Sequence, residues 1–230
     1  MILQRFDSAA AAAAAMAEQV AMALRMGVAW RERGSVAVAG GRTPVPLFHA
    51  LRDAELDWGR VGITLTDERW VPEDHPASNA GLVRRELLAG RAGAARFMPL
   101  HDGSASAAAA TGAVWRNLKP LARPFDAVVL GMGADGHFAS LFPGEPELAA
   151  ALDPAAAPAC VAMRAPVAPQ ERISLNLAAL LQARRVFLLV TGEAKLELLL
   201  SAARLEPKSP YPVTALLAQR SPAPEVYWAP

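Results

Sequence analysis

The residues with the clearest chemical potential lie in one stretch, Phe125 to Gly144, which reads FDAVVLGMGADGHFASLFPG. Its apolar run, Ala127 to Leu130, is too short for a helix and predicts a buried strand. Three glycines follow the run, and glycine lets the backbone take positive φ and approach a ligand closely. Asp135 and His137 stand two residues apart on this predicted rim. A carboxylate beside an imidazole is a candidate general-base pair, so we expect His137 to act on a bound substrate.

Three other predicted strands also end in polar residues. In a parallel α/β sheet, ligands bind beyond the carboxyl ends of the strands, which lie at one edge. Taken alone, each polar group has an ordinary explanation as a turn, a solvated loop or a surface lysine. Together they predict one crevice that also contains His137. The groups are Gly40, Gly41, Arg42 and Thr43 after Val36–Ala39, Asp67, Glu68 and Arg69 after Gly62–Thr66, and Gly192 with Lys195 after Val186–Val190.

Strand-like runs alternate with helical segments along the chain. Ser8 is a predicted N-cap for an alanine-rich helix that continues to about Arg33. A chain of 230 residues suits one α/β domain, or at most a domain with a small lobe. We therefore predict a single domain over residues 1–230, with a doubly wound, mainly parallel sheet and helices on both faces, as in Rossmann-like folds.

The rest of the chain is predicted to continue this alternation of helices and strands. Helices are predicted after Pro44, after Ser78 or Asn79, over the stretch containing Gly103–Ala113, after Gly192 and over Val213–Gln219, while Ile173–Ala183 is predicted to be part strand and part helix. Short strands are predicted at Cys160–Met163 and Val226–Trp228, a surface excursion over Leu152–Pro169, and loops at Asp67–Asn79 and Pro207–Pro212.

Composition excludes several classes of protein. The net charge of +1 gives no electrostatic basis for binding nucleic acid or a membrane. Cys160 is the single cysteine, which excludes an internal disulfide and a zinc site built from cysteine pairs. The alanine run near the N-terminus lacks the basic segment and leucine-rich core of a signal peptide. We expect a cytoplasmic protein that binds a small molecule.

One motif match is misleading. Gly131, Gly133 and Gly136 fit the dinucleotide-binding pattern GxGxxG. The pattern is informative only in a first βα unit with an acidic residue about 20 positions further on, and both conditions fail here. We therefore do not predict a nicotinamide cofactor.

Five segments, in order, resemble the 6-phosphogluconolactonases of the glucosamine-6-phosphate isomerase/6-phosphogluconolactonase family. They are AGGRTP, TDERWVPEDHPASN, GMGADGHFASLFPG, ERISL and VTGEAK, and they span most of the chain. The loop AGGRTP departs from the family pattern, which is near SGGSTP, because Ala39 and Arg42 replace two serines.

The resemblance implies hydrolysis of 6-phospho-D-glucono-1,5-lactone in the pentose phosphate pathway. His137 would activate water, Asp135 or Asp67 would orient the imidazole, and Arg69 or glycine-loop N–H groups would stabilise the oxyanion. The phosphate would bind Gly40, Gly41, Arg42, Thr43, Arg172 and Lys195. The resemblance implies no metal or organic cofactor, and it leaves the oligomeric state open between a monomer and a homodimer.

Two alternatives use the same fold. Glucosamine-6-phosphate deaminases carry a carboxylate five residues after the histidine, where this chain has Phe142, which cannot transfer a proton. Sugar-phosphate-sensing domains of transcription regulators accompany a DNA-binding module, and this sequence starts with the first helix of the sugar-binding domain. Both observations favour the lactonase.

Overall fold

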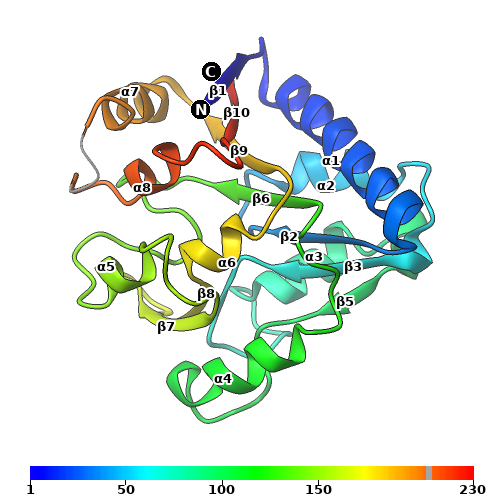
Figure 1. Cartoon of the computed structure of the whole chain (residues 1–230), viewed down its shortest axis with the longest axis horizontal. Helices are drawn as coiled ribbons and strands as arrows, with labels where there is room; N and C mark the ends of the chain where they lie inside the picture. Colours follow the sequence, from blue (N-terminus) through cyan, green and yellow to red (C-terminus); the bar gives the residue numbers. More distant parts are fainter. Residues whose placement is uncertain (206–208) are drawn as a thin grey trace.

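A seven-stranded parallel sheet forms the centre of the computed structural model, which describes residues 1–205 and 209–230. The apolar runs expected to be strands lie in its middle, and several of them have no exposed residue. The strand order is β1-β10-β9-β6-β2-β3-β5 (Figure 1). The strands are β1 (Ile2–Arg5), β2 (Gly34–Val38), β3 (Val61–Leu65), β5 (Arg96–Met98), β6 (Ala127–Gly131), β9 (Val186–Thr191) and β10 (Glu225–Ala229).

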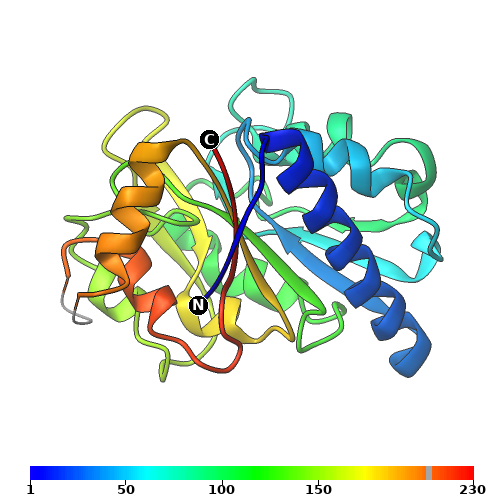
Figure 2. The same ribbon diagram turned by 90° about the horizontal axis from the view of Figure 1, so that it is seen from above.

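Helices cover both faces of this sheet. Helix α1 begins after Ser8, whose hydroxyl accepts a hydrogen bond from the Ala11 N–H at 3.2 Å, as the sequence predicts. It packs with α2 on one face, while α7 and α8 cover the other (Figure 2). The helices are α1 (Ala9–Arg31), α2 (Val45–Arg52), α3 (Asn79–Glu86), α4 (Ala107–Asn117), α5 (Leu148–Ala151), α6 (Leu177–Leu181), α7 (Glu193–Ala202) and α8 (Val213–Leu217), with short 3₁₀ turns at Trp58–Arg60 and Gly90–Ala94.

A second, antiparallel sheet was not expected from the sequence. Strand β4 (Asp67–Arg69) pairs with β8 (Glu171–Leu175), which also pairs with β7 (Cys160–Arg164). The prediction that Asp67–Arg69 lies in a loop is therefore wrong. Three polar residues form a strand here because a partner about 100 residues away supplies the ladder hydrogen bonds, and no local pattern reveals such a partner.

Two strands of the main sheet, β1 and β5, were also not predicted from the sequence. Strand β1 pairs with β10, so segments near the two ends of the chain are neighbours in one sheet. Strand β5 is three residues long and lies at the opposite edge. Edge strands are short and partly polar, and this removes the apolar pattern by which a strand is recognised. The predicted loop Pro207–Pro212 begins outside the described residues.

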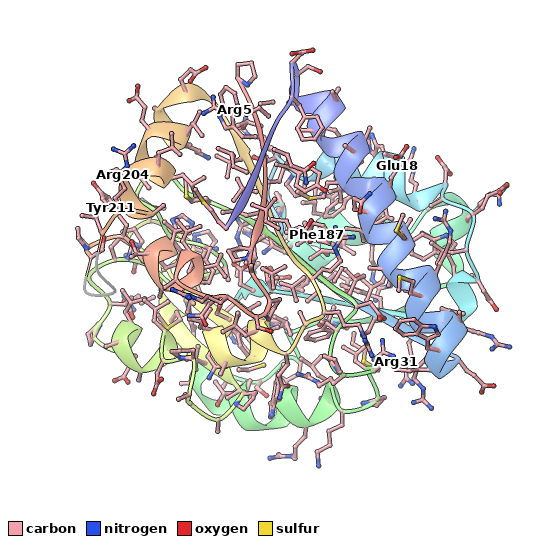
Figure 3. The ribbon with its side chains drawn as sticks, turned by 45° about the horizontal axis from the view of Figure 1, so that its top comes forward. Arg5, Glu18, Arg31, Phe187, Arg204 and Tyr211 are labelled. Atoms are coloured by element: carbon pink, nitrogen blue, oxygen red, sulfur yellow. The ribbon has the colours of Figure 1, made fainter. Side chains whose placement is uncertain are left out.

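The core lies between the sheet and its helices. Phe187 of β9 is fully buried there, while Arg31, in the last turn of α1, forms an ion pair with the buried Asp126 just before β6 (Figure 3). Asp126 also accepts a hydrogen bond from the Ser35 N–H at 2.9 Å, which ties α1, β2 and β6 together. Within the described residues, no helix is long and apolar enough to cross a membrane.

The connections place a crevice at one point of the main sheet. From β2 the chain moves outward through β3 to β5, then returns to β6 and moves the other way through β9 to β10. The two directions separate between β2 and β6, and doubly wound sheets bind ligands at such a switch point. The doubly wound, mainly parallel architecture predicted from the sequence is confirmed.

Candidate active site

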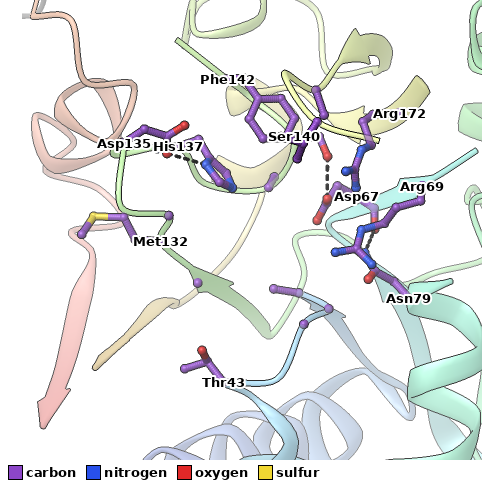
Figure 4. Close-up of a pocket in the computed structure, with 18 of the residues that line it drawn as sticks. Thr43, Asp67, Arg69, Asn79, Met132, Asp135, His137, Ser140, Phe142 and Arg172 are labelled. Atoms are coloured by element: carbon purple, nitrogen blue, oxygen red, sulfur yellow. Dashed lines mark hydrogen bonds and ion pairs between the residues drawn. The ribbon is translucent and has the colours of Figure 1, made fainter. Parts of the chain in front are cut away.

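A cavity of about 570 Å³ opens at the carboxyl edge of the sheet between the loops that follow β2 and β6 (Figure 4). Its volume falls in the range typical of small-molecule sites. The small sheet forms another side through β4 and β8. Eight predicted site residues line it, namely Gly40, Gly41, Thr43, Asp67, Arg69, Asp135, His137 and Arg172.

His137 and Asp135 form a hydrogen-bonded pair on the loop after β6. The imidazole Nδ1 lies 2.5 Å from Asp135 Oδ1, and the same oxygen accepts the His137 backbone N–H at 3.2 Å. An ionised carboxylate only accepts hydrogen bonds, so its partner Nδ1 is the nitrogen that carries the proton, and in the neutral imidazole Nε2 then has the lone pair. The pair therefore has the arrangement of a general base held in one tautomer by a carboxylate.

Gly133 leaves the space that this pair occupies. A Cβ atom built on Gly133 would lie 2.2 Å from two ring atoms of His137 and 2.6 Å from Asp135 Oδ1. Real Cβ contacts are never so short, and only the absence of a side chain permits this packing. The glycine that resembles part of a nucleotide-binding motif thus serves the base pair.

The variant Gly133→Ala is expected to lose activity by displacing both side chains. A shift of about 1 Å in a catalytic group can cost about 10²-fold in rate, so we expect kcat to fall by about 10- to 100-fold. Steady-state kinetics measures the loss. The control is Gly59→Ala, where the nearest atom would be 3.5 Å from the new Cβ, and a Gly133→Ala enzyme as active as this control would contradict the prediction.

Asp67 lines the same cavity, but its hydrogen bonds are to Thr66 and Ser140. Its Oδ2 accepts the Ser140 hydroxyl at 2.6 Å and its Oδ1 accepts the Thr66 hydroxyl at 3.1 Å. Of the two carboxylates that the sequence left open, Asp135 contacts the imidazole in this structure. The link from Asp67 to Ser140 joins the small sheet to the loop after His137 (Figure 4).

Two arginines face the cavity from the small sheet. Arg69 and Arg172 are directly opposite each other in the β4–β8 ladder. Arg172 is 6% exposed, and in the described part of the chain its Nε has no hydrogen-bond partner. Burial lowers the pKa of Arg172, Arg69 lowers it further, and Asp67 and Glu68 oppose both. Like charges across a ladder repel, so this cavity wall is suited to an anion.

Glu68 holds strand β4 against the start of α3. Side chains alternate along a strand, so Glu68 points away from the face that carries Asp67 and Arg69. It is fully buried and accepts the backbone N–H groups of Arg69, Asn79 and Ala80, each at 2.7 Å. Burial raises the pKa of Glu68, and these N–H donors oppose the rise. These contacts give Glu68 a structural role, outside the cavity that Asp67 and Arg69 line.

Asn79 connects this region to the glycine loop after β2. Ser78, rather than Asn79, is the N-cap of α3. The Asn79 amide instead donates to the Asp67 carbonyl at 2.9 Å and lines the cavity. A Cβ on Gly40 would lie 1.9 Å from Asn79 Oδ1, so this close approach requires glycine.

The structure does not place Arg42 or Lys195 among the cavity-lining residues. Arg42 is exposed, while its neighbours Gly40, Gly41 and Thr43 line the cavity. Lys195, in the first turn of α7, donates from Nζ to the Met132 carbonyl at 2.8 Å. Met132 belongs to the lining, so Lys195 contacts the site through the glycine loop.

Several residues that line the cavity were not predicted from the sequence. Asn79 has only the pattern of a helix-cap residue and Ser140 that of a loop residue, so no motif marks either as part of a site. Phe142 was distinguished only by its lack of a titratable group. Ala165, Pro166 and Val167 come from the turn between β7 and β8, within the segment expected to pass over the surface. Only the pairing of β4 with β8 brings that turn to the cavity. In the described residues, no group of three or more His, Cys, Asp or Glu side chains could hold a metal ion.

The fold and site match a known class of protein. A family profile described as "Glucosamine-6-phosphate isomerases/6-phosphogluconolactonase" matches residues 7–228, and the chain belongs to this family. Among its relatives, a 6-phosphogluconolactonase of Pseudomonas aeruginosa is 43% identical over 99% of this chain and 94% of the relative. A 6-phosphogluconolactonase of Neisseria meningitidis is 40% identical over 99% of each chain.

Solved structures agree with this assignment. A 6-phosphogluconolactonase from Shewanella baltica superposes with a TM-score of 0.94 at 39% identity, covering 100% of this chain and 98% of the other. A monomeric glucosamine-6-phosphate deaminase superposes with a TM-score of 0.80 over 100% of this chain and 97% of the other. At 15% identity, the deaminase shows the shared fold alone.

Proposed function

We propose that this chain hydrolyses 6-phospho-D-glucono-1,5-lactone to 6-phospho-D-gluconate. The observation that carries the proposal is the Asp135–His137 pair, bonded through Nδ1 at a cavity whose opposite wall contains the buried Arg172 guanidinium, with an Nε that has no hydrogen-bond partner among the described residues. A base at one end and a cation at the other suit a neutral electrophile attached to an anion. The named relatives, which are 6-phosphogluconolactonases, support the same substrate.

Arg172 and the glycine loop are assigned to the phosphate. Backbone N–H groups of Gly40 and Gly41 and the Thr43 hydroxyl are donors of the kind that bind phosphate. Arginine matches phosphate geometry with two parallel hydrogen bonds, and burial strengthens such a pair. Arg42 and Lys195 remain proposed ligands, and each would have to turn toward the cavity on binding, because neither lines it in this structure.

His137 is assigned the proton transfers. Its Nε2 would remove a proton from water as the water oxygen attacks the lactone carbonyl. The tetrahedral intermediate would then break its bond to the ring oxygen, which receives the proton from the imidazolium, and the new carboxylic acid would ionise to the gluconate. General-base catalysis of this kind contributes about 10²–10⁴-fold in rate.

Asp135 and Arg69 are assigned supporting roles. Asp135 would hold the Nδ1 proton and stabilise the imidazolium during the reaction. Arg69 lines the cavity and donates one N–H to the Ala77 carbonyl at 2.5 Å. Its other N–H groups, or backbone N–H groups of the glycine loop that carries His137, would meet the oxyanion on the carbonyl oxygen. Asp67 would position Ser140 and the loop that carries His137, since its two oxygens already accept hydroxyl groups.

We further propose that residues 1–230 act as one domain. The pairing of β1 with β10 places both ends of the chain in one sheet, and the family profile covers nearly the whole length. We expect a small-molecule substrate, no nucleic-acid partner and action in the cytoplasm. The net charge of +1 supports the first two points.

A coupled assay tests the activity. Glucose-6-phosphate dehydrogenase generates the lactone in place, and loss of the lactone is followed with and without the protein. We expect the protein to accelerate lactone loss well beyond spontaneous hydrolysis, and to release no ammonia from glucosamine 6-phosphate. Lactone decay at the spontaneous rate would overturn the proposal, and ammonia release would point to the deaminase reaction instead.

A further inference from the structure

The ring of Phe142 packs against the His137 imidazole and lies near the Arg172 guanidinium. Its centroid lies 4.5 Å from that of the His137 imidazole, with the two planes tilted by 47°. The guanidinium carbon of Arg172 lies 5.9 Å from the same centroid. Phe142 lies between the two side chains in Figure 4, and it is 6% exposed.

The imidazole needs a second restraint besides Asp135. The side chains of His137 and Asp135 are 30% and 39% exposed, so neither is held by close burial. One hydrogen bond at Nδ1 fixes one point of the ring but permits it to swing about that point. Packing against an aromatic ring restricts this swing, and tilted aromatic contacts at this separation are favourable by about 0.5–1.5 kcal/mol.

We propose that Phe142 is a positioning residue for His137, an inference that rests on the lactonase function proposed above. Asp135 fixes the tautomer, and the Phe142 ring fixes the direction of Nε2 toward the substrate carbonyl. The contact with Arg172 is secondary, because 5.9 Å is near the outer limit of about 6 Å for a cation–π interaction. Because the Phe142 ring lies closer to His137 than to Arg172, we expect its loss to affect turnover more than phosphate binding.

The kinetic test compares Phe142→Leu with Phe142→Tyr. Leucine keeps an apolar side chain but removes the ring, so we expect kcat to fall by about 10- to 100-fold while KM changes by less than about threefold. Tyrosine keeps the ring and is expected to retain kcat within about threefold of the parent enzyme. The control is Phe97→Leu, which removes a partly buried phenylalanine that contacts Arg84 at 5.1 Å and does not line the cavity.

A spectroscopic test is independent of turnover. The chain has four histidines, so its proton NMR spectrum contains four Cε1–H imidazole signals, and the signal lost in His137→Gln is that of His137. The aromatic ring of Phe142 shifts this signal by its ring current. We expect Phe142→Leu to move the His137 signal and leave the other three in place, with Phe142→Tyr close to the parent.

The outcomes separate this inference from the proposed function. A parent enzyme without lactonase activity would overturn the function, whatever the spectra show. An active parent whose Phe142→Leu variant keeps kcat, or raises KM alone, would overturn the positioning role. An unmoved His137 signal in Phe142→Leu would overturn it as well, and thermal unfolding of each variant checks that the compared proteins are folded.

Discussion

Replacing His137 with glutamine is expected to lower kcat by about 10²–10⁴-fold, the usual contribution of a general base. Glutamine retains a hydrogen-bonding side chain of similar length but cannot remove a proton from water near neutral pH. The His137 side chain is 30% exposed and lies on a loop, so the free energy of unfolding should change by less than about 0.5 kcal/mol. Stopped assays of lactone loss, with thermal unfolding alongside, measure both quantities.

The matched control is His49→Gln. His49 is likewise partly exposed and hydrogen-bonded to a carboxylate, that of Glu86 at 2.8 Å, but it lies on α2 outside the cavity. Its replacement should leave kcat within about twofold of the parent. A His137→Gln enzyme that keeps more than about a third of the parental kcat would remove His137 from the proposed chemistry.

The companion variant Asp135→Asn separates orientation from charge. An asparagine amide can donate to Nδ1, and it would then stabilise the tautomer that carries its proton on Nε2. The imidazole would remain in place but could not act as the base, so we expect a loss of kcat comparable with that of His137→Gln. Asp135→Asn with normal kcat would instead favour Asp67 as the partner of His137, the alternative that the sequence left open.

The sequence predicted the strands that consist of buried apolar residues. Ala127–Leu130 and Val186–Val190 have residues that are buried from both sides, and their hydrophobicity follows directly from this position. Strands β1, β4 and β5 could not be recognised, because they are short, polar or stabilised by partners distant in sequence. Local pattern carries no information about such partners.

The sequence predicted the site residues that lie at strand ends, but not those that tertiary folding brings to the cavity. Glycines after β2 and β6, and the Asp135–His137 pair, lie at strand ends, and strand ends can be read from sequence. Phe142 could be read only as a residue without proton chemistry, since its contact with His137 depends on how the loop folds back. The turn at Ala165–Val167 reaches the cavity through the second sheet, so no motif could have assigned it.

Arg172→Met is expected to weaken substrate binding strongly without destabilising the free protein. A buried arginine that binds phosphate contributes several kcal/mol in the complex, so we expect KM to rise by at least about 10-fold, and kcat to fall as well, because phosphate binding positions the lactone. In the free protein Arg172 is 6% exposed, lies opposite Arg69, and has an Nε without a hydrogen-bond partner in the described residues. Replacing buried charges of this kind with an apolar side chain of similar volume is often neutral or stabilising.

Thermal unfolding with and without inorganic phosphate measures both effects. Without phosphate, the midpoint of Arg172→Met should equal or exceed that of the parent, by about 2–4 °C for each kcal/mol gained in a chain of this size. Excess phosphate should raise the midpoint of the parent but not that of the variant, because a ligand stabilises only the state that binds it. The control is Arg164→Met, which removes an exposed arginine from the same hairpin and should keep the phosphate response.

Two outcomes would contradict these expectations. An Arg172→Met protein that is less stable than the parent by more than about 1 kcal/mol would show that Asp67 and Glu68 already compensate the Arg172 charge. An unchanged response to phosphate in Arg172→Met would mean that the anion binds elsewhere in the cavity.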